Sequence, residues 1–251
     1  MAPRLRVQQG GTGDLVVVLL HGLGATGDVW SRLHRTLGER WPGRWIAPDL
    51  PGHGGSAPLP VYSFGHLAGA VARVIPPASR VVVLGHSLGG VVGLALASGW
   101  FGVRVAAVCG VGIKVVWTGE ELARTRALSA RPNPVYPTRI EAAERHLKVA
   151  GLAGLVTPEE VPDAALVKGD AGWTIAFDPA AFGVGAPDMA GLLAAARAPV
   201  TLAVGERDPM CRVDQLRTLV PDPVVLAGLG HNAHVEAPAA LVPLLERLTT
   251  L

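Results

Sequence analysis

The sequence predicts an α/β fold, with a mainly parallel β-sheet that carries helices on both of its faces. Short, continuously apolar runs alternate with longer segments in which apolar residues recur at every third or fourth position. Continuous apolar runs are typical of strands buried on both faces, and their alternation with helices favours a parallel sheet. The chain has 251 residues, of which 49% are hydrophobic and 17% charged, which is enough to bury one large core.

The predicted strands share an uninterrupted apolar character. In chain order they are Leu15 to Leu20, Trp45 to Ala47, Val81 to Leu84, Val103 to Val108, Val200 to Val204 and Val224 to Ala227. The predicted helices share the helical spacing of apolar residues. They are Trp30 to Leu37, Leu67 to Val74, Val91 to Ala97, Val213 to Val220 and Leu241 to Leu248. In a sheet of this kind the functional groups gather at the carboxyl ends of the strands.

The alternation fails between residues 113 and 187, where the pattern becomes helical and is interrupted by prolines. The helices expected there are Glu120 to Leu128, Arg139 to Val149 and Pro158 to Val167. Acid-before-base pairs support exposed helices, and the candidates are Glu120/Arg124, Glu141/Arg145 and Glu144/Lys148. We interpret residues 113–186 as a helical cap inserted into a core made of residues 1–112 and 187–251.

Charge and cysteine content argue against several classes of protein. The formal charge of +2 comes from 22 basic and 20 acidic side chains, so no field of one sign favours nucleic acid as a partner. Cys109 and Cys211 lie far apart and imply no disulfide framework. Residues 81–103 carry no charged side chain, but their glycines indicate a buried strand, turn and helix instead of a membrane span. The start of the chain has no secretory signal, so we expect a cytoplasmic protein; its oligomeric state stays open.

The segment from Gly85 to Gly90 reads Gly-His-Ser-Leu-Gly-Gly and directly follows a predicted strand. A G-x-S-x-G pattern between a strand and a helix is typical of a sharp turn that exposes a nucleophilic serine. Glycines on both sides of the serine lack the Cβ atoms that would collide in that turn. The pattern therefore predicts Ser87 as a nucleophile for a substrate carbonyl.

A serine hydroxyl needs a base to take its proton, and the base needs a carboxylate that holds it in one tautomer. The predicted strand 200–204 runs into Asp208, and the strand 224–227 leads to His231. These two residues are the first candidates for acid and base. The alternatives that the sequence leaves open are Glu206 and Asp214 for the acid and His234 for the base.

The order of these motifs resembles that of the α/β-hydrolase fold family, in its compact form with a helical cap. The motifs that carry the resemblance are His21-Gly22, Pro48 to Ser56, Gly85 to Gly90, Gly205 to Asp208, and Gly230-His231 with Glu236 and Pro238 downstream. The resemblance implies Ser87 as nucleophile, Asp208 as acid and His231 as base, without a cofactor. It also implies an oxyanion hole formed by the backbone amides of Leu23 and Leu88.

The glycine-rich stretches and the paired histidines give no sign of a metal or nucleotide. His231 and His234 have a spacing found in metal sites, but no cysteine pair or carboxylate cluster completes a ligand set. The stretches 10–13 and 22–27 lack the lysine of a phosphate loop. We therefore expect no metal, no cofactor and a small-molecule acyl substrate.

For the other histidines and tryptophans near these motifs, a structural role competes with contact to the substrate. His21 and His53 are expected to support the glycine-rich loops, and His86 to pack beside the nucleophile or touch the substrate. Trp117 is a candidate for the substrate pocket, whereas Trp173 is expected to pack between cap and core.

Three functions fit the sequence. We expect a serine hydrolase that cleaves a carboxylic ester or related acyl compound through an acyl-enzyme on Ser87. An alternative is a lyase that uses the same residues as a base, because Gly230 to Glu236 resembles the menaquinone-pathway synthase, which eliminates pyruvate; Val91 stands where that family has an arginine. Another alternative is a non-catalytic ligand-binding member of the fold. The identity and acyl length of the substrate do not follow from the sequence.

Overall fold

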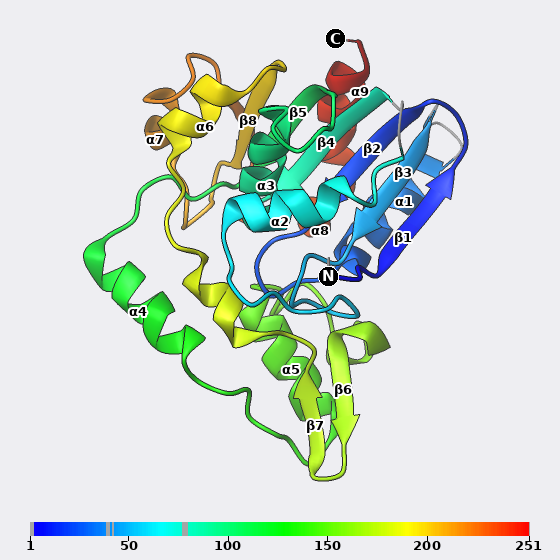
Figure 1. The fold of residues 1–251 in the computed structure, drawn as a ribbon, viewed down its shortest axis with the longest axis vertical. Coiled ribbons are helices and arrows are strands. Elements are labelled where there is room, and N and C mark those ends of the chain that lie inside the picture. Colours follow the sequence, from blue (N-terminus) through cyan, green and yellow to red (C-terminus); the bar gives the residue numbers. More distant parts are fainter. Residues whose placement is uncertain (1–2, 39–40, 42, 77–79, 251) are drawn as a thin grey trace.

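The computed structural model describes residues 3–38, 41, 43–76 and 80–250. Its centre is a sheet with the strand order β1-β3-β2-β4-β5-β8-β9 (Figure 1). The strands are β1 (Val7–Gly11), β2 (Leu15–Leu20), β3 (Arg44–Pro48), β4 (Arg80–His86), β5 (Val105–Val111), β8 (Val200–Gly205) and β9 (Val224–Leu226). β1 runs antiparallel to β3, and the other neighbouring pairs in this order are parallel. The predicted fold class is confirmed.

Helices cover both faces of the sheet, because successive residues of its central strands point to opposite sides. On one face, Val18 and Val83 belong to a core cluster shared with α2 (Phe64–Ala72), α3 (Leu88–Ala97), α6 (Met189–Ala195) and α7 (Val213–Arg217). On the other face, Leu19 and Leu84 share a cluster with α1 (Ser31–Leu37) and α9 (Val242–Thr250). All four of these strand residues are fully buried. Figure 1 shows α2 and α3 in front of the sheet and α9 behind it.

Residues 113–186, which we call the cap segment, follow the carboxyl end of β5. They contain α4 (Gly119–Ser129), α5 (Arg139–Val149) and a hairpin of β6 (Leu166–Gly169) and β7 (Gly172–Ile175). Short 3-10 helices complete the segment at Pro158–Glu160, Asp163–Ala165 and Pro179–Val184. Figure 1 shows these elements gathered together beyond one end of the sheet. The helices predicted at 120–128 and 139–149 are confirmed.

The prediction of one helix from Pro158 to Val167 is wrong. Two 3-10 turns, Pro158–Glu160 and Asp163–Ala165, replace it, and β6 begins at Leu166. The break falls at Val161, which has φ −64° and ψ 123°. Pro162 follows it, has no N–H to donate and forces the preceding residue out of helical geometry. The cap segment therefore mixes helices with a hairpin.

Smaller differences concern strand ends and the edge of the sheet. β5 extends to Val111 instead of ending at Val108, and β9 ends at Leu226. Strand β1 was not among the predicted strands, because Val-Gln-Gln-Gly-Gly contains no apolar run; it is held by antiparallel pairing along β3.

Only part of the predicted charge pairing in the cap segment occurs. Arg124 and Glu120 form the expected ion pair at 3.3 Å. Glu141 instead accepts hydrogen bonds from the backbone N–H and hydroxyl of Thr138, at 3.0 and 2.8 Å. Glu141 therefore caps the start of α5 and does not pair with Arg145. The predicted pair Glu144/Lys148 is also absent among the ion pairs of the described residues.

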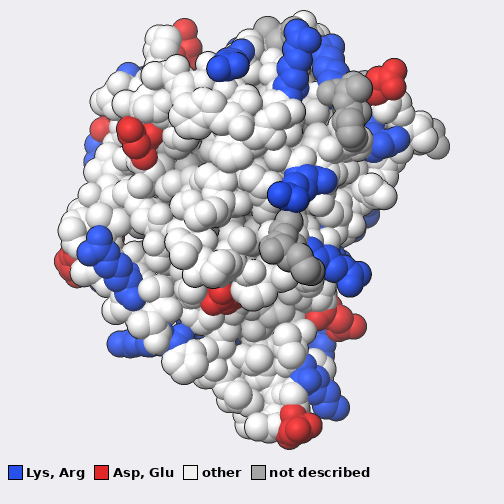
Figure 2. Space-filling model, in the orientation of Figure 1, with Lys and Arg blue, Asp and Glu red and all other residues white. Residues whose placement is uncertain are grey.

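The surface carries both signs of charge. Figure 2 shows isolated basic and acidic side chains scattered around a largely uncharged face, in keeping with the formal charge of +2. Within the described ranges, no helix is both long enough and apolar enough to cross a membrane.

Candidate active site

Ser87 occupies the turn between β4 and α3. Its φ of 48° and ψ of −114° make it the one non-glycine residue of the described chain with a positive φ. Such a conformation costs about 1–3 kcal/mol and persists only where the surroundings impose it. The Ser87 N–H donates to the carbonyl of Val111 at 2.8 Å, which ties the turn to the end of β5.

The glycines around Ser87 are required by close backbone contacts. A Cβ on Gly85 would lie 2.3 Å from the carbonyl oxygen of Gly89, and one on Gly89 would lie 2.2 Å from that of Leu20. Carbon and oxygen atoms do not approach this closely without displacement of the backbone. The expectation that these glycines permit the turn is confirmed.

Asp208 and His231 lie together at the carboxyl ends of β8 and β9. Asp208 Oδ2 accepts a hydrogen bond from His231 Nδ1 at 2.8 Å. The other carboxylate oxygen, Oδ1, accepts from the backbone N–H groups of Met210 at 2.7 Å and Cys211 at 3.2 Å. The Asp208 side chain is fully buried, whereas 14% of the His231 side chain is exposed. These bonds hold the carboxylate in place. The other ring nitrogen of His231, Nε2, takes no part in the bond to Asp208.

The alternative acids and base have other partners. Glu206 accepts from the backbone N–H of Gly228 at 2.7 Å and so holds the loop after β9. Asp214 pairs with Arg212 on the surface. His234 is buried and packs against the Trp30 ring, with 4.7 Å between ring centroids. Of the candidates left open by the sequence, only Asp208 and His231 form an acid–histidine pair among the described residues.

The loop that carries His231 is clamped on both sides. The Glu236 carboxylate accepts from the N–H of Gly230 at 2.7 Å and from the N–H of Asn232 at 3.1 Å. His86, directly before Ser87, hydrogen-bonds through Nε2 to the carbonyl of His231 at 2.9 Å. Since a carbonyl only accepts, Nε2 of His86 carries the proton.

His86 is a neutral, buried ring in this arrangement. Burial lowers the pKa of His86 well below its ordinary value, and the neighbouring His234 and His231 lower it further. The His86 ring lies 4.3 Å from the His234 ring and 4.7 Å from the His231 ring, between centroids. His86 therefore links the turn of Ser87 to the loop of His231.

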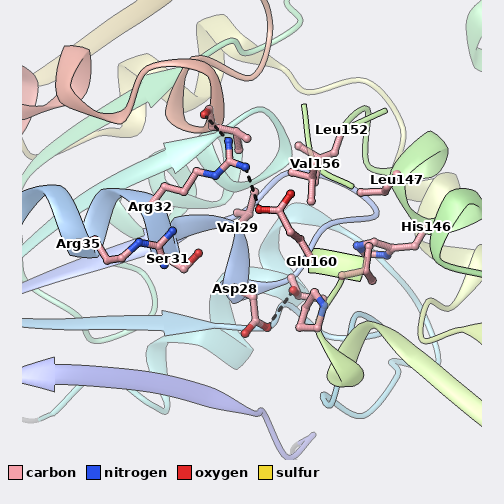
Figure 3. Close-up of a pocket in the computed structure, with 14 residues that line it drawn as sticks. Asp28, Val29, Ser31, Arg32, Arg35, His146, Leu147, Leu152, Val156 and Glu160 are labelled. Carbon is pink, nitrogen blue, oxygen red and sulfur yellow. Dashed lines mark hydrogen bonds and ion pairs between the residues drawn. The ribbon is translucent and has the colours of Figure 1, made fainter. Parts of the chain in front are cut away.

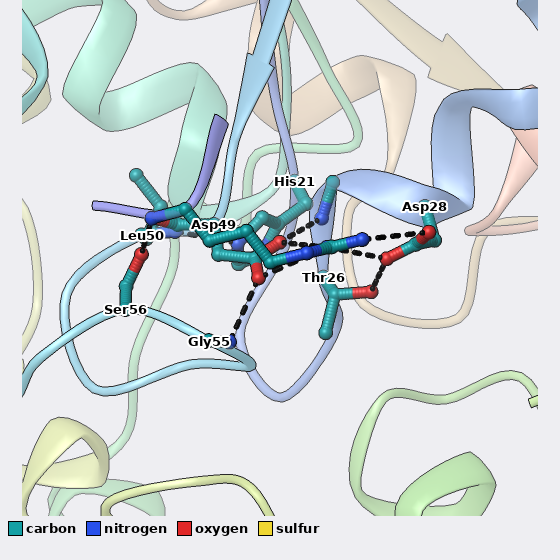
Figure 4. Close-up of polar contacts among 9 residues, drawn as sticks. His21, Thr26, Asp28, Asp49, Leu50, Gly55 and Ser56 are labelled. Atoms are coloured by element: carbon teal, nitrogen blue, oxygen red, sulfur yellow. Dashed lines mark hydrogen bonds and ion pairs between the residues drawn. The ribbon is translucent and has the colours of Figure 1, made fainter. Parts of the chain in front are cut away.

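The loop after β2 is held beside Ser87 by His21. The Nε2 atom of His21 accepts from the N–H of Leu50 at 2.8 Å (Figure 4). Nδ1 therefore carries the proton and donates to the carbonyl of Gly22 at 2.8 Å. Burial lowers the pKa of His21 to about 4, which keeps the ring neutral. A Cβ on Gly22 would lie 3.5 Å from the Cβ of Ser87, so the two loops are in contact.

A buried carboxylate that the sequence analysis did not single out supports the same loops. Asp49 Oδ1 accepts from the N–H of Gly27 at 2.7 Å, and Oδ2 accepts from that of Gly55 at 3.0 Å. Arg6 reaches Asp49 at 3.2 Å and Asp28 at 2.7 Å (Figure 4). The network joins the residue before β1, the residue after β3 and the loop after β2. No sequence pattern links residues so far apart.

Two cavities, of about 100 and about 300 Å³, open onto Ser87. Their shared lining consists of Leu23, Ser87, Lys114, Trp117, Thr125, Phe182 and Met210. The smaller cavity adds Leu88 and Val91, and the larger adds His231. Residues on the core and on the cap segment thus surround Ser87 and His231 together. No hydrogen bond joins these two side chains among the described contacts, and bonds of this kind often tighten only when substrate binds.

The cavities also place residues that the sequence left open or missed. Trp117 lines both of them, whereas Trp173 lies in β7 and packs against the core as a half-buried residue. Lys114 and Phe182 were not singled out, because no local pattern marks them. Met210 lies two positions after Asp208 and was missed for the same reason.

A separate cavity of about 300 Å³ lies between α1 and the cap segment (Figure 3). The Arg32 guanidinium and the Glu160 carboxylate pair across it at 3.3 Å, and His146 points into it from α5. It shares no lining residue with the cavities at Ser87. Within the described residues, no group of three or more histidine, cysteine or carboxylate side chains has the arrangement to hold a metal ion.

Known proteins resemble this chain over most of its length. The 2-succinyl-6-hydroxy-2,4-cyclohexadiene-1-carboxylate synthase of Escherichia coli O81 (strain ED1a) is 27% identical over 241 residues, which cover 92% of each chain. Among solved structures, the thioesterase domain from the curacin biosynthetic pathway has a TM-score of 0.79 at 23% identity and covers 97% of this chain and 95% of its own. E-2-(acetamidomethylene)succinate hydrolase has a TM-score of 0.78 at 22% identity, with coverages of 98% and 95%.

A family model supplies the broader assignment. The model described as alpha/beta hydrolase family matches residues 17–244, which span both the sheet and the cap segment. The structural neighbours share the fold, but their sequence identities are too low to assign their substrates to this chain. The chain belongs to the alpha/beta hydrolase family.

Proposed function

We propose that this protein is a serine hydrolase that cleaves a carboxylic ester or related acyl compound through an acyl-enzyme on Ser87. The observation that carries the proposal is the Asp208–His231 pair, joined at 2.8 Å, whose histidine lines the same cavity as Ser87 in its strained turn. Residues 1–112 and 187–251 supply these groups as the core, and residues 113–186 cover them as a cap.

Acylation begins when His231 Nε2 takes the Ser87 hydroxyl proton and Ser87 Oγ attacks the acyl carbon. Asp208 holds the proton on His231 Nδ1 and stabilises the imidazolium that forms. The backbone N–H groups of Leu23 and Leu88 donate to the oxyanion of the tetrahedral intermediate. His231 then gives its proton to the leaving alcohol or thiol, and the acyl group stays on Ser87.

Deacylation repeats the steps with water. His231 Nε2 takes a proton from a water molecule, whose oxygen attacks the acyl carbon. A second tetrahedral intermediate forms at the same N–H groups and collapses to the free acid. The proton returns from His231 to Ser87 Oγ, so no cofactor is consumed.

The test is hydrolysis of p-nitrophenyl esters from acetate to dodecanoate by the wild type and by Ser87→Ala. We expect turnover by the wild type and a loss of at least about 10³-fold in kcat for the variant. The preferred chain length measures the acyl pocket. A Ser87→Ala protein that hydrolyses its best ester at the wild-type rate would contradict the proposal. Circular dichroism of both proteins controls for folding.

A lyase is the second candidate, favoured by the full-length similarity to the Escherichia coli synthase. In this reading His231 removes a proton from the substrate carbon and no acyl-enzyme forms. Val91 lines the cavity beside Ser87 and makes that wall apolar where the synthase family has an arginine. Release of pyruvate from the synthase's substrate, detected with lactate dehydrogenase, tests this candidate. Serine-dependent pyruvate release without ester hydrolysis would replace the first proposal.

A further inference from the structure

Lys114 places a positive charge in a mostly apolar cavity beside the proposed nucleophile. It lies three residues after the end of β5, lines both cavities at Ser87, and only 14% of its side chain is exposed. Among the described residues that line the smaller cavity, Lys114 is the only charged one. Its apolar neighbours there include Leu23, Leu88 and Val91. A cation in such surroundings needs acceptors for its N–H groups.

The acceptors around Lys114 are incomplete. Its Nζ donates to Oε1 of Glu121 on α4 and lies 5.0 Å from the centroid of the Trp117 ring. An ammonium group has three N–H donors, and the described side chains and backbone accept one of them. Lys114 therefore retains hydrogen-bonding capacity that a ligand in the cavity can use.

The other charged groups of the cavities have partners of their own. Arg124 pairs with Glu120 of the same helix, and both side chains are mostly exposed. Glu121 holds Lys114 with one oxygen and the N–H of Thr118 with the other, at 2.9 Å. Its side chain is 38% exposed, at the outer side of the site. His231 is committed to Asp208.

We infer that Lys114 binds a carboxylate carried by the substrate, so that the site prefers acyl compounds with an anionic group. The inference rests on the proposed hydrolase function and names its substrate class. The carboxylate belongs either to the acyl chain or to the leaving group, and both place an acceptor on the spare donors of Lys114. Glu121 shares the same ammonium and weakens this binding by repulsion.

The test compares matched esters with and without a carboxylate. The acyl pair is p-nitrophenyl hydrogen glutarate against p-nitrophenyl valerate, and the leaving-group pair is 3-carboxy-4-nitrophenyl butyrate against p-nitrophenyl butyrate. The measured quantity is the ratio of kcat/KM for the anionic ester to kcat/KM for its neutral partner. The pair with the larger wild-type ratio identifies which part of the substrate carries the charge.

Variants of Lys114 and Glu121 make the ratio diagnostic. Lys114→Met is expected to lower the ratio by about tenfold or more, which corresponds to the loss of one charged hydrogen bond. Lys114→Arg is expected to retain most of the ratio. Glu121→Gln is expected to raise it about threefold, since a competing charge is removed. The control Arg126→Met, which removes an exposed charge of α4 that lines neither cavity, is expected to keep the ratio within about twofold.

The outcomes separate this inference from the proposed function. Equal losses for the anionic and neutral esters in Lys114→Met, with the ratio unchanged, would assign Lys114 a structural role and overturn the inference. If no ester is hydrolysed in a Ser87-dependent way, the proposed function fails, and calorimetric titration with glutarate and valeramide decides the inference by itself. Glutarate binding that Lys114→Met abolishes supports it, and equal or absent binding of both compounds overturns it.

Discussion

The loops that carry Ser87, Asp208 and His231 differ from the cap helix α4 that faces them. In the loops, buried polar atoms have fixed partners: both Asp208 oxygens accept hydrogen bonds, and Glu236 clamps the flanks of His231. Helix α4 fully buries none of its residues; it packs against the 3-10 helix Pro179–Val184, and the Lys114–Glu121 pair joins it to the segment after β5. We therefore expect these loops to be more rigid than α4.

Acid should destabilise both the core and the cap segment through their buried histidines, and this is the largest expected effect. Burial lowers the pKa of His21 and His146 to about 4 and that of His53 and His234 to about 3. In the unfolded chain a histidine titrates near about 6.5. Between these pH values the histidines are protonated in the unfolded state but neutral in the folded state. The free energy of unfolding is therefore highest above pH 6.5 and decreases as the pH is lowered. Each histidine contributes a slope of up to about 1.4 kcal/mol per pH unit.

Urea unfolding at pH 7.5, 6.5, 5.5 and 4.5 checks this prediction. A free energy of unfolding that stays constant between pH 7.5 and 4.5 would contradict it. The variant His234→Phe keeps an aromatic ring against Trp30 and removes a group that has no hydrogen bond among the described residues. We expect the free energy of unfolding of this variant to depend less steeply on pH, by the contribution of about one proton.

Replacing the proposed acid should abolish most of the hydrolase activity without removing a contact to the cap segment. Asp208→Asn should lower kcat for the best ester by about 10³- to 10⁴-fold, because the amide no longer holds His231 in the required tautomer. Asp214→Asn, on the surface beside Arg212, is the matched control and should stay within about twofold. A loss of similar size in both variants, or in neither, would remove Asp208 from its proposed role.

His86 tests whether the core loops act as one unit. His86→Phe keeps the packing against His234 but loses the N–H that donates to the His231 carbonyl. We expect kcat to fall by up to about tenfold, the value of one hydrogen bond, with KM unchanged. A change in KM alone would mean that His86 contacts substrate and does not position His231.

The smallest effect should come from the cap of α4. Thr118 and Thr138 begin α4 and α5 with the same capping box, and replacement of either by alanine removes about 1 kcal/mol of helix stability. Helix α5 buries several residues, so Thr138→Ala should lower the global free energy of unfolding by that amount. Helix α4 buries none, so Thr118→Ala should speed amide exchange within α4 and leave global unfolding unchanged. Equal global losses would show that α4 belongs to the cooperative core.

Much of the fold was predictable because its signals are local. The apolar runs of β2, β4 and β8 and the helical spacing of α3 and α5 are properties of short segments. The weakest predictions fell where a proline or an edge decides the structure. Pro162 divides the expected helix after Pro158, and β1 depends on its partner β3 and not on its own sequence.

The sequence by itself determined the strand–helix order, the turn at Ser87 with its two glycines, and a short list of acids and bases. Only the tertiary structure showed which of Asp208, Glu206 and Asp214 pairs with a histidine, because the pairing depends on which carboxylate reaches His231, 23 residues after Asp208. It also brought Lys114 beside Ser87 and joined Arg6 to Asp49. Contacts of this kind depend on how strands and loops distant in sequence meet at one edge of the sheet, which no local pattern encodes.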